Sequence, residues 1–190
     1  MSLFGLGAVL IGIWYVQHRD HDGGRAGDPD VKELVLQLGD LPPGYKTFVH
    51  ERSSETVGSE SAPGYSVLYR REKVALGTLL TTPLLVASTV TTFRTPAAAR
   101  LKIRDLVRRN AGPQTSEFRS LRAPRIGIGT LFYQGQQQVP GSALRAKFLV
   151  LAWRHGRIVA TVATVGVEKG QRRETIRLAR LEQIRLAAVH

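Results

Sequence analysis

Four residues near the N-terminus carry the side chains of a metal site: His18, Asp20, His21 and Asp22. Imidazole nitrogens and carboxylate oxygens are zinc ligands, so this cluster could hold a metal ion. The surrounding residues, HRDHDGGRAG, form a glycine-rich linker that cannot hold ligands in place before a metal binds. No further ligand follows nearby in the sequence, and we expect no metal and no other cofactor.

The remaining histidines and glycines do not form a catalytic motif. His50 precedes Glu51 on a predicted strand, so the two side chains point to opposite faces and cannot act together. His155 falls in a polar turn, where we expect solvent around it. The sequence Gly-Ile-Gly at 127–129 is followed by a strand-like run, whereas a phosphate-binding loop requires a helix there. No Gly-x-Ser-x-Gly elbow is present either, so we predict that the chain is not an enzyme.

Cysteine is absent from all 190 residues. This excludes disulfides, thiolate catalysis, cysteine-ligated zinc and cysteine-linked lipid anchors. The apolar content of 43% is ordinary for a globular protein, and the length suits one domain with an appendage.

Positive charge is concentrated in the second half of the chain. Residues 1–93 hold 8 Lys or Arg and 10 Asp or Glu, a net charge of −2. Residues 94–190 hold 19 and 5, a net charge of +14. Such a surface suits an anionic partner, namely an acidic protein, phospholipid headgroups or nucleic acid. The alternative is a solvated surface that uses arginine without any partner.

An uncharged apolar stretch, Ser2–Val16, begins the chain and ends in two aromatic residues. About 17 apolar residues is the lower limit for a helix that crosses a bilayer, and aromatic residues favour the membrane interface. We therefore predict a single-pass transmembrane anchor over 1–17. The anchoring side chains are Leu3, Phe4, Trp14 and Tyr15. A cleaved signal peptide and a buried soluble helix are the alternatives, and the missing basic n-region disfavours the first.

The domain follows a linker at 18–29 and covers 30–190. Its central stretch, Phe148–Val167, has two apolar runs on either side of the polar turn Arg154–Arg157. This pattern predicts a β-hairpin of two strands, Leu144–Trp153 and Arg157–Val167.

Capping residues predict three helices. Asp28 or Asp30 begins the first, which ends at Gly39. Thr95 and Pro96 begin the second, which runs to Asn110. The third covers Gln171–Val189, with Ile176, Ala179, Leu181, Ile184 and Ala188 as its core face.

Alternating or β-branched runs predict four further strands: Tyr45–Glu51, Tyr65–Glu72, Leu84–Phe93 and Thr130–Tyr133. We expect an exposed loop at Arg52–Gly64, an irregular basic segment at Phe118–Ile128 and a polar turn at Gln134–Gly141. This order of elements predicts an α+β domain with a mainly antiparallel sheet and helices packed on its faces.

Several short strings match a known family in the same order: LGDLPPGY, TFRTPAAAR, PRIGIGT and AWRHGRIVATVATVG. With them, residues 30–189 resemble the PsbP-like fold of bacterial envelope proteins, shared with the extrinsic photosystem II protein and Ran-binding relatives. The resemblance implies an α/β/α sandwich around an antiparallel sheet and a non-catalytic role outside the cytoplasmic membrane. Many such proteins are lipoproteins, and this chain departs from them because it has no cysteine.

We predict a membrane-anchored, non-catalytic accessory or interaction subunit that docks on a larger membrane protein complex or acidic surface, a photosynthetic complex by family analogy. The partner-binding side chains are expected to be Arg154, Arg157, Arg172, Arg173, Arg177 and Arg180. The alternative is nucleic-acid or anionic-lipid binding through the basic half. We expect the domain on the extracytoplasmic side of the cell membrane, and the basic residues after the anchor leave the cytoplasmic side open.

Overall fold

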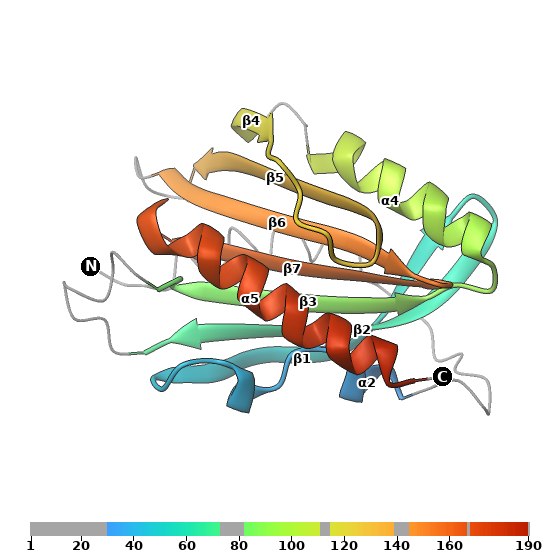
Figure 1. Cartoon of the computed structure of the whole chain (residues 1–190), viewed down its shortest axis with the longest axis horizontal. Helices are drawn as coiled ribbons and strands as arrows, with labels where there is room; N and C mark the ends of the chain where they lie inside the picture. Colours follow the sequence, from blue (N-terminus) through green and yellow to red (C-terminus); the bar gives the residue numbers. More distant parts are fainter. Residues whose placement is uncertain (1–29, 73–81, 111–114, 139–144, 167, 190) are drawn as a thin grey trace.

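The protein is described by a computed structural model over residues 30–72, 82–110, 115–138, 145–166 and 168–189. These residues form a seven-stranded sheet in the order β1-β2-β3-β7-β6-β5-β4 (Figure 1). Every neighbouring pair of strands is antiparallel. The sheet therefore joins the two halves of the sequence at its centre, where β3 pairs with β7.

The strands are β1 (Tyr45–Val57), β2 (Glu60–Arg71), β3 (Leu85–Thr92), β4 (Thr115–Ser120), β5 (Ile128–Gln138), β6 (Arg145–His155) and β7 (Ile158–Gly166). The helices are α2 (Val31–Leu34), the 3₁₀ helix η1 (Leu38–Asp40), α4 (Pro96–Asn110) and α5 (Glu168–Ala187).

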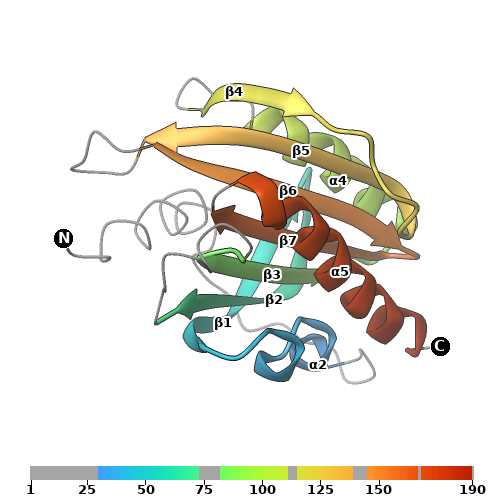
Figure 2. The ribbon, with the colours of Figure 1, turned by 60° about the vertical axis from the view of Figure 1, so that its left-hand side comes forward.

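Side chains alternate between the two faces of the sheet, and both faces are apolar at its centre. In β7, Ala160 and Val162 belong to the cluster that contains α5 residues, whereas Val159 belongs to the cluster that contains α4 residues. Because successive strand residues point to opposite faces, α5 and α4 lie on opposite sides of the sheet. Figure 2 shows α5 in front of the strands and α4 behind β5 and β6.

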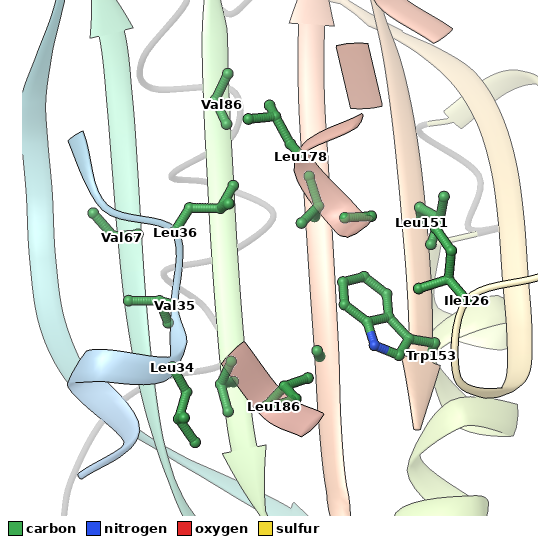
Figure 3. Close-up of a cluster of buried hydrophobic side chains, with 14 of the residues drawn as sticks. Leu34, Val35, Leu36, Val67, Val86, Ile126, Leu151, Trp153, Leu178 and Leu186 are labelled. Atoms are coloured by element: carbon green, nitrogen blue, oxygen red, sulfur yellow. The ribbon is translucent and has the colours of Figure 1, made fainter. Parts of the chain in front are cut away.

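The larger core lies between the sheet and α5, with α2 and the residues after it at one side (Figure 3). Leu178 and Leu186 project from α5 toward the sheet, and Leu36 covers β3. Trp153 is fully buried, and its Nε1 donates a hydrogen bond to Gln183 Oε1 at 2.6 Å. This contact attaches the end of β6 to the last turns of α5.

The described structure does not support the predicted N-terminal transmembrane helix, nor the membrane and single-pass assignments that follow from it. No helix among the described residues is both long and apolar enough to cross a bilayer. The longest, α5, has 20 residues but carries several arginines, which a bilayer interior disfavours. The four anchoring residues Leu3, Phe4, Trp14 and Tyr15 lie outside the described residues.

The predicted α/β/α sandwich also needs correction. The described chain is a seven-stranded antiparallel sheet whose helices cover only part of its surface. α4 contributes side chains to one small cluster, at the end of the sheet near the β6–β7 turn. The rest of that face holds a third apolar cluster to which no described helix contributes.

Local structure agrees with the capping prediction at two helices. Thr95 is the N-cap of α4, since its Oγ1 accepts a hydrogen bond from Ala98 N at 3.1 Å. Asp30 caps α2 through Lys32 N, also at 3.1 Å. The predicted hairpin strands correspond to β6 and β7, joined by the turn at Gly156.

Candidate functional site

A cavity of about 190 Å³ opens between the first turns of α5 and the strands β4, β5 and β6. Apolar side chains and basic side chains meet in its lining. The apolar side chains are Leu121 and Leu149, and the basic ones are Arg119, Lys147 and Arg172. Gln134, Gly135 and Gln171 complete the wall together with Phe148, whose side chain belongs to the cluster on the other face of the sheet. None of these lining residues is acidic.

The α5 wall of the cavity is held by a buried polar cluster. Gln171 is only 2% exposed, and its Nε2 donates to the backbone oxygen of Thr164 on β7 at 2.7 Å. The hydroxyl of Thr175 lies 2.7 Å from that of Thr164 and also donates to Gln171 O at 2.7 Å. These buried polar groups provide hydrogen-bond partners for one another, and their bonds hold the start of α5 against β7.

Arg172 is held in place at the rim of the cavity. Its guanidinium carbon lies 5.6 Å from the ring centroid of Phe132, a residue that is buried on β5. A guanidinium within about 6 Å of an aromatic ring is attracted by it. Its Nη2 also donates to Arg122 O at 3.4 Å. The charge of Arg172 is therefore positioned while its side chain stays exposed.

The electrostatics of the cavity favour an anion. Three basic side chains surround an apolar floor, and an apolar wall strengthens the attraction of a charge compared with open water. The aligned peptide dipoles of α5 add partial positive charge near its N-terminus. A carboxylate attached to an apolar group matches this combination of side chains.

The six arginines predicted to bind a partner do not form one surface. Arg172 lines the cavity, and Arg173 and Arg180 are exposed on α5. Arg177 is engaged within the molecule, because it forms an ion pair with Glu174 at 2.6 Å and donates to Asp40 O. That engagement leaves Arg177 poorly placed to bind an external anion.

The other two arginines lie at the β6–β7 turn. Arg154 donates to Gly156 O at 2.9 Å, and Arg157 is exposed. Lys147 and Arg154 are seven residues apart on β6, about 23 Å at the rise of a β-strand. The turn and the cavity are therefore separate basic sites, and partner binding by Arg154 and Arg157 stays a prediction.

Arg119 and Lys147 are the cavity residues that sequence reasoning missed. Arg119 was assigned to an irregular segment, and Lys147 begins a strand whose apolar residues suggested only a core. The signal that could have found Lys147 is its position at the polar end of an otherwise apolar strand. Nothing in the sequence places either residue beside α5.

A buried carboxyl group lies further along α5, away from the cavity. Glu182 is fully buried, and its Oε2 accepts a hydrogen bond from Ser88 Oγ at 2.6 Å. Ser88 Oγ in turn accepts from Leu36 N at 3.1 Å. Burial raises the pKa of Glu182 well above its usual value, against the opposing effects of Ser88 and Arg185. These contacts tie α5, β3 and the segment after α2 together, which is a structural role.

The histidines of the described chain have hydrogen-bond partners. His50 Nδ1 lies 3.0 Å from Tyr65 Oη, and His155 Nδ1 lies 3.1 Å from Gln183 Nε2. Within the described residues, no group of three His, Cys, Asp or Glu side chains could hold a metal ion. The cluster at 18–22 lies outside them.

No protein-family model and no curated protein matches this chain. The resemblance to the PsbP-like fold consequently stays a prediction, together with the accessory role that it implies. What supports a function is the chemistry of the described residues, above all the three basic side chains around an apolar floor.

Proposed function

We propose that this chain is a non-catalytic interaction domain that docks an acidic partner protein at the cavity between α5 and β4–β6. The observation that supports the proposal is the cavity itself, with Arg119, Lys147 and Arg172 around an apolar floor and no acidic residue among the described residues that line it. A partner segment would insert an apolar side chain and place a neighbouring carboxylate against the basic groups.

The size of the cavity favours a protein segment over a free small molecule. Small-molecule sites usually enclose about 300–1,000 Å³. This cavity encloses about 190 Å³, enough for one side chain of a partner. A single anchoring side chain in a pocket, surrounded by charged contacts, is a common arrangement at protein interfaces.

Exposed arginines beside the cavity would assist the encounter. Arg173 is exposed directly after Arg172 on α5, and Arg180 is exposed about two turns further along the same helix. Complementary charge at the rim of an interface mainly raises the association rate, and this effect is weakened by salt. Docking of an acidic partner should therefore slow as ionic strength rises.

The test uses dye-labelled peptides of alternating Glu and Leu, with Lys-Leu peptides of the same length for comparison, in fluorescence anisotropy. We expect the full chain to bind the acidic peptides. Lys147→Gln combined with Arg172→Gln should weaken binding at least tenfold, which corresponds to about 1.4 kcal/mol.

The matched control removes two arginines from the other side of the sheet. Arg100→Gln with Arg104→Gln changes the same net charge on exposed positions of α4 and should leave peptide affinity unchanged. Equal losses in both variants, or no binding of acidic peptides at all, would overturn the proposal. Tight binding of a random duplex DNA with a steep salt dependence would point to nucleic acid instead.

A further inference from the structure

Leu149 supplies the buried apolar side chain on the floor of the cavity, where it is 6% exposed. The sheet register places it directly opposite Gln134 on β5, and Gln134 directly opposite Arg119 on β4. On β7 it is opposite Thr164, whose backbone oxygen accepts the hydrogen bond from Gln171. Because directly opposite residues share one face of a sheet, Arg119, Gln134 and Leu149 form one row on the α5 face.

The basic side chains approach this floor from three directions. Lys147 is two residues before Leu149 on β6, so it shares the same face at a Cα distance of about 7 Å. Arg119 is two strands away, about 10 Å at the spacing of neighbouring strands. Arg172 comes from α5, and its guanidinium is held over the Phe132 ring at 5.6 Å. Positive charge therefore surrounds a single buried apolar position.

The volume of the cavity limits what can enter it. The cavity encloses about 190 Å³, and an apolar cavity of about 150 Å³ is large enough for benzene. One apolar side chain of a partner therefore nearly fills the space over Leu149. An anionic group of the same partner must then be attached close to that side chain if it is to meet the basic groups around it.

An acidic residue inside a partner chain does not supply both groups at such a short separation. In an extended chain, successive side chains point to opposite faces, so the residue next to an inserted apolar side chain directs its carboxylate away. The nearest residue on the same face is about 7 Å along the strand. In a helix, the same-face neighbours lie about 5–6 Å apart between Cβ atoms. A C-terminal residue, in contrast, carries its side chain and its carboxylate on one Cα atom.

We infer that the cavity binds the C-terminal residue of the partner, with an apolar side chain over Leu149 and the terminal carboxylate between Arg119, Lys147 and Arg172. This inference rests on the proposed docking function and specifies which part of the partner enters the cavity. Guanidinium and ammonium groups donate strong, charge-assisted hydrogen bonds to a carboxylate. Capture of a terminal carboxylate is also a recurring mode of peptide recognition.

The test uses four peptides of equal length, each with a dye at its N-terminus and leucine as its last residue. Two have an acidic body and two a neutral body, and one of each pair ends in a free carboxylate and the other in an amide. Fluorescence anisotropy measures their affinity for the full chain. We expect the amide to weaken binding at least tenfold with either body, because it removes the charge that the basic groups attract. A terminal glycine in place of leucine should also weaken binding, because it leaves the apolar floor unfilled.

A variant of the cavity shows where the carboxylate binds. In Arg172→Gln, the loss of affinity on amidation should fall below about threefold, because the two changes remove the same interaction. Arg173→Gln is the matched control, since Arg173 is the next residue on α5, is exposed and does not line the cavity. It should keep the full loss on amidation. If Arg172→Gln does not fold by circular dichroism, Arg119→Gln, at an exposed position on the edge strand β4, replaces it.

The remaining outcomes separate this inference from the proposed function. Equal binding of the two acidic peptides would overturn the inference and leave docking of an acidic segment intact. Equal affinity of the acidic and neutral peptides with a free end would support the terminal site and contradict the acidic partner. Binding of none of the four peptides would overturn both. Displacement of the free-acid peptide by an equal concentration of N-acetyl-leucine would assign the cavity to a small carboxylate and overturn the inference.

Discussion

Among single residues, the two glycines that flank Ile128 have different surroundings. Both have a positive φ, 58° at Gly127 and 64° at Gly129, a region that other residues rarely adopt. A Cβ at Gly127 would lie 2.5 Å from Trp153 Cδ1 and 2.8 Å from the backbone oxygen of Arg154, whereas one at Gly129 would meet nothing within 4 Å. Gly127 is thus required for the close approach to β6, whereas Gly129 is favoured only by its backbone conformation.

Gly127→Ala should therefore destabilise the protein more than Gly129→Ala. The left-handed backbone costs about 1–2 kcal/mol for either alanine. The clash with Trp153 and Arg154 adds about 1–3 kcal/mol at Gly127 alone. Urea unfolding of the two variants measures the difference, and equal losses of unfolding free energy would contradict the close approach.

Glu182 is a carboxylic acid whose protonation the fold controls. Its carboxyl group is fully buried between α5, β3 and the segment after α2, with Asp40 and Arg185 as the charged groups that act on it, and its Oε1 has no hydrogen-bond partner. Burial raises its pKa in the folded state, so the folded state binds a proton more tightly than the unfolded state does. The folded state therefore gains stability from the protonated form of Glu182. This contribution to the unfolding free energy is complete below the unfolded pKa of about 4.3, and it is lost as pH rises through the folded pKa.

Glu182→Gln should remove this pH dependence because glutamine stays neutral. Relative to the variant, the wild type should lose up to about 1.4 kcal/mol of unfolding free energy per pH unit above pH 4.3, until the folded pKa is reached. Urea unfolding between pH 4 and 8 measures the loss. Glu33→Gln, at an exposed position, is the control and should track the wild type at every pH. A difference in unfolding free energy between wild type and Glu182→Gln that stays constant with pH would contradict the raised pKa of Glu182.

Among the elements, the β1–β2 hairpin departs most from expectation. Residues 52–64 were predicted to form an exposed loop because they are rich in Ser, Glu and Gly, yet β1 and β2 continue through them to a turn at Gly58. The long hairpin reaches α4, as Figure 1 shows. Val57 and Ala62 join the α4 cluster, and Lys102 of α4 forms a buried ion pair with Glu55. The polar residue Glu55 is therefore buried because it pairs with Lys102 on α4, a contact that the sequence around Glu55 does not predict.

Breaking the Lys102–Glu55 pair should separate α4 from the hairpin. Lys102 and Glu55 side chains are 3% and 7% exposed, so Lys102→Met leaves a buried carboxylate and should cost about 3–5 kcal/mol of unfolding free energy. Adding Glu55→Leu should restore much of that loss, because the charge is then removed as well.

The control for this cycle is the surface pair of Lys46 and Glu72. Their side chains are 70% and 38% exposed at a distance of 2.8 Å, so Lys46→Met should cost less than about 1 kcal/mol. Chemical denaturation of the wild type and these three variants gives the losses of unfolding free energy. A loss at Lys102→Met as small as at Lys46→Met would show that the buried pair does not hold α4.

Elements with strong local sequence signals were predicted correctly, whereas the extent of β5 and the buried face of α5 were not. α4 and the hairpin β6–β7 have strong local signals, Thr95-Pro96 and two apolar runs, and the structure confirms both. The expected polar turn after Tyr133 is wrong, because its glutamines continue β5 as far as Gln138. Ile184 was expected in the core of α5 but is 66% exposed, while Leu178 and Leu186 are buried. The orientation of α5 against the sheet therefore decides that Leu178 and Leu186 are buried while Ile184 is exposed.

At the scale of the whole molecule, the basic half of the sequence is not one basic surface. The sheet interleaves the halves, since β3 lies beside β7. The arginines of α4 and those of α5 are on opposite faces. A partner therefore meets local groups of charged side chains, such as those around the cavity at the start of α5. The net charge of +14 in residues 94–190 does not identify where on the surface that partner binds.

The sequence by itself determined the main secondary structure, the capped start of α4 and the absence of any cysteine chemistry, because these depend on neighbouring residues or composition. Only the tertiary structure decided which residues share the cavity: Arg119, Lys147 and Arg172 come from three elements far apart in the chain. It also decided that Glu182 is buried and Ile184 exposed. Strand order and helix orientation depend on contacts between distant residues, and these contacts minimise exposed apolar surface over the whole chain.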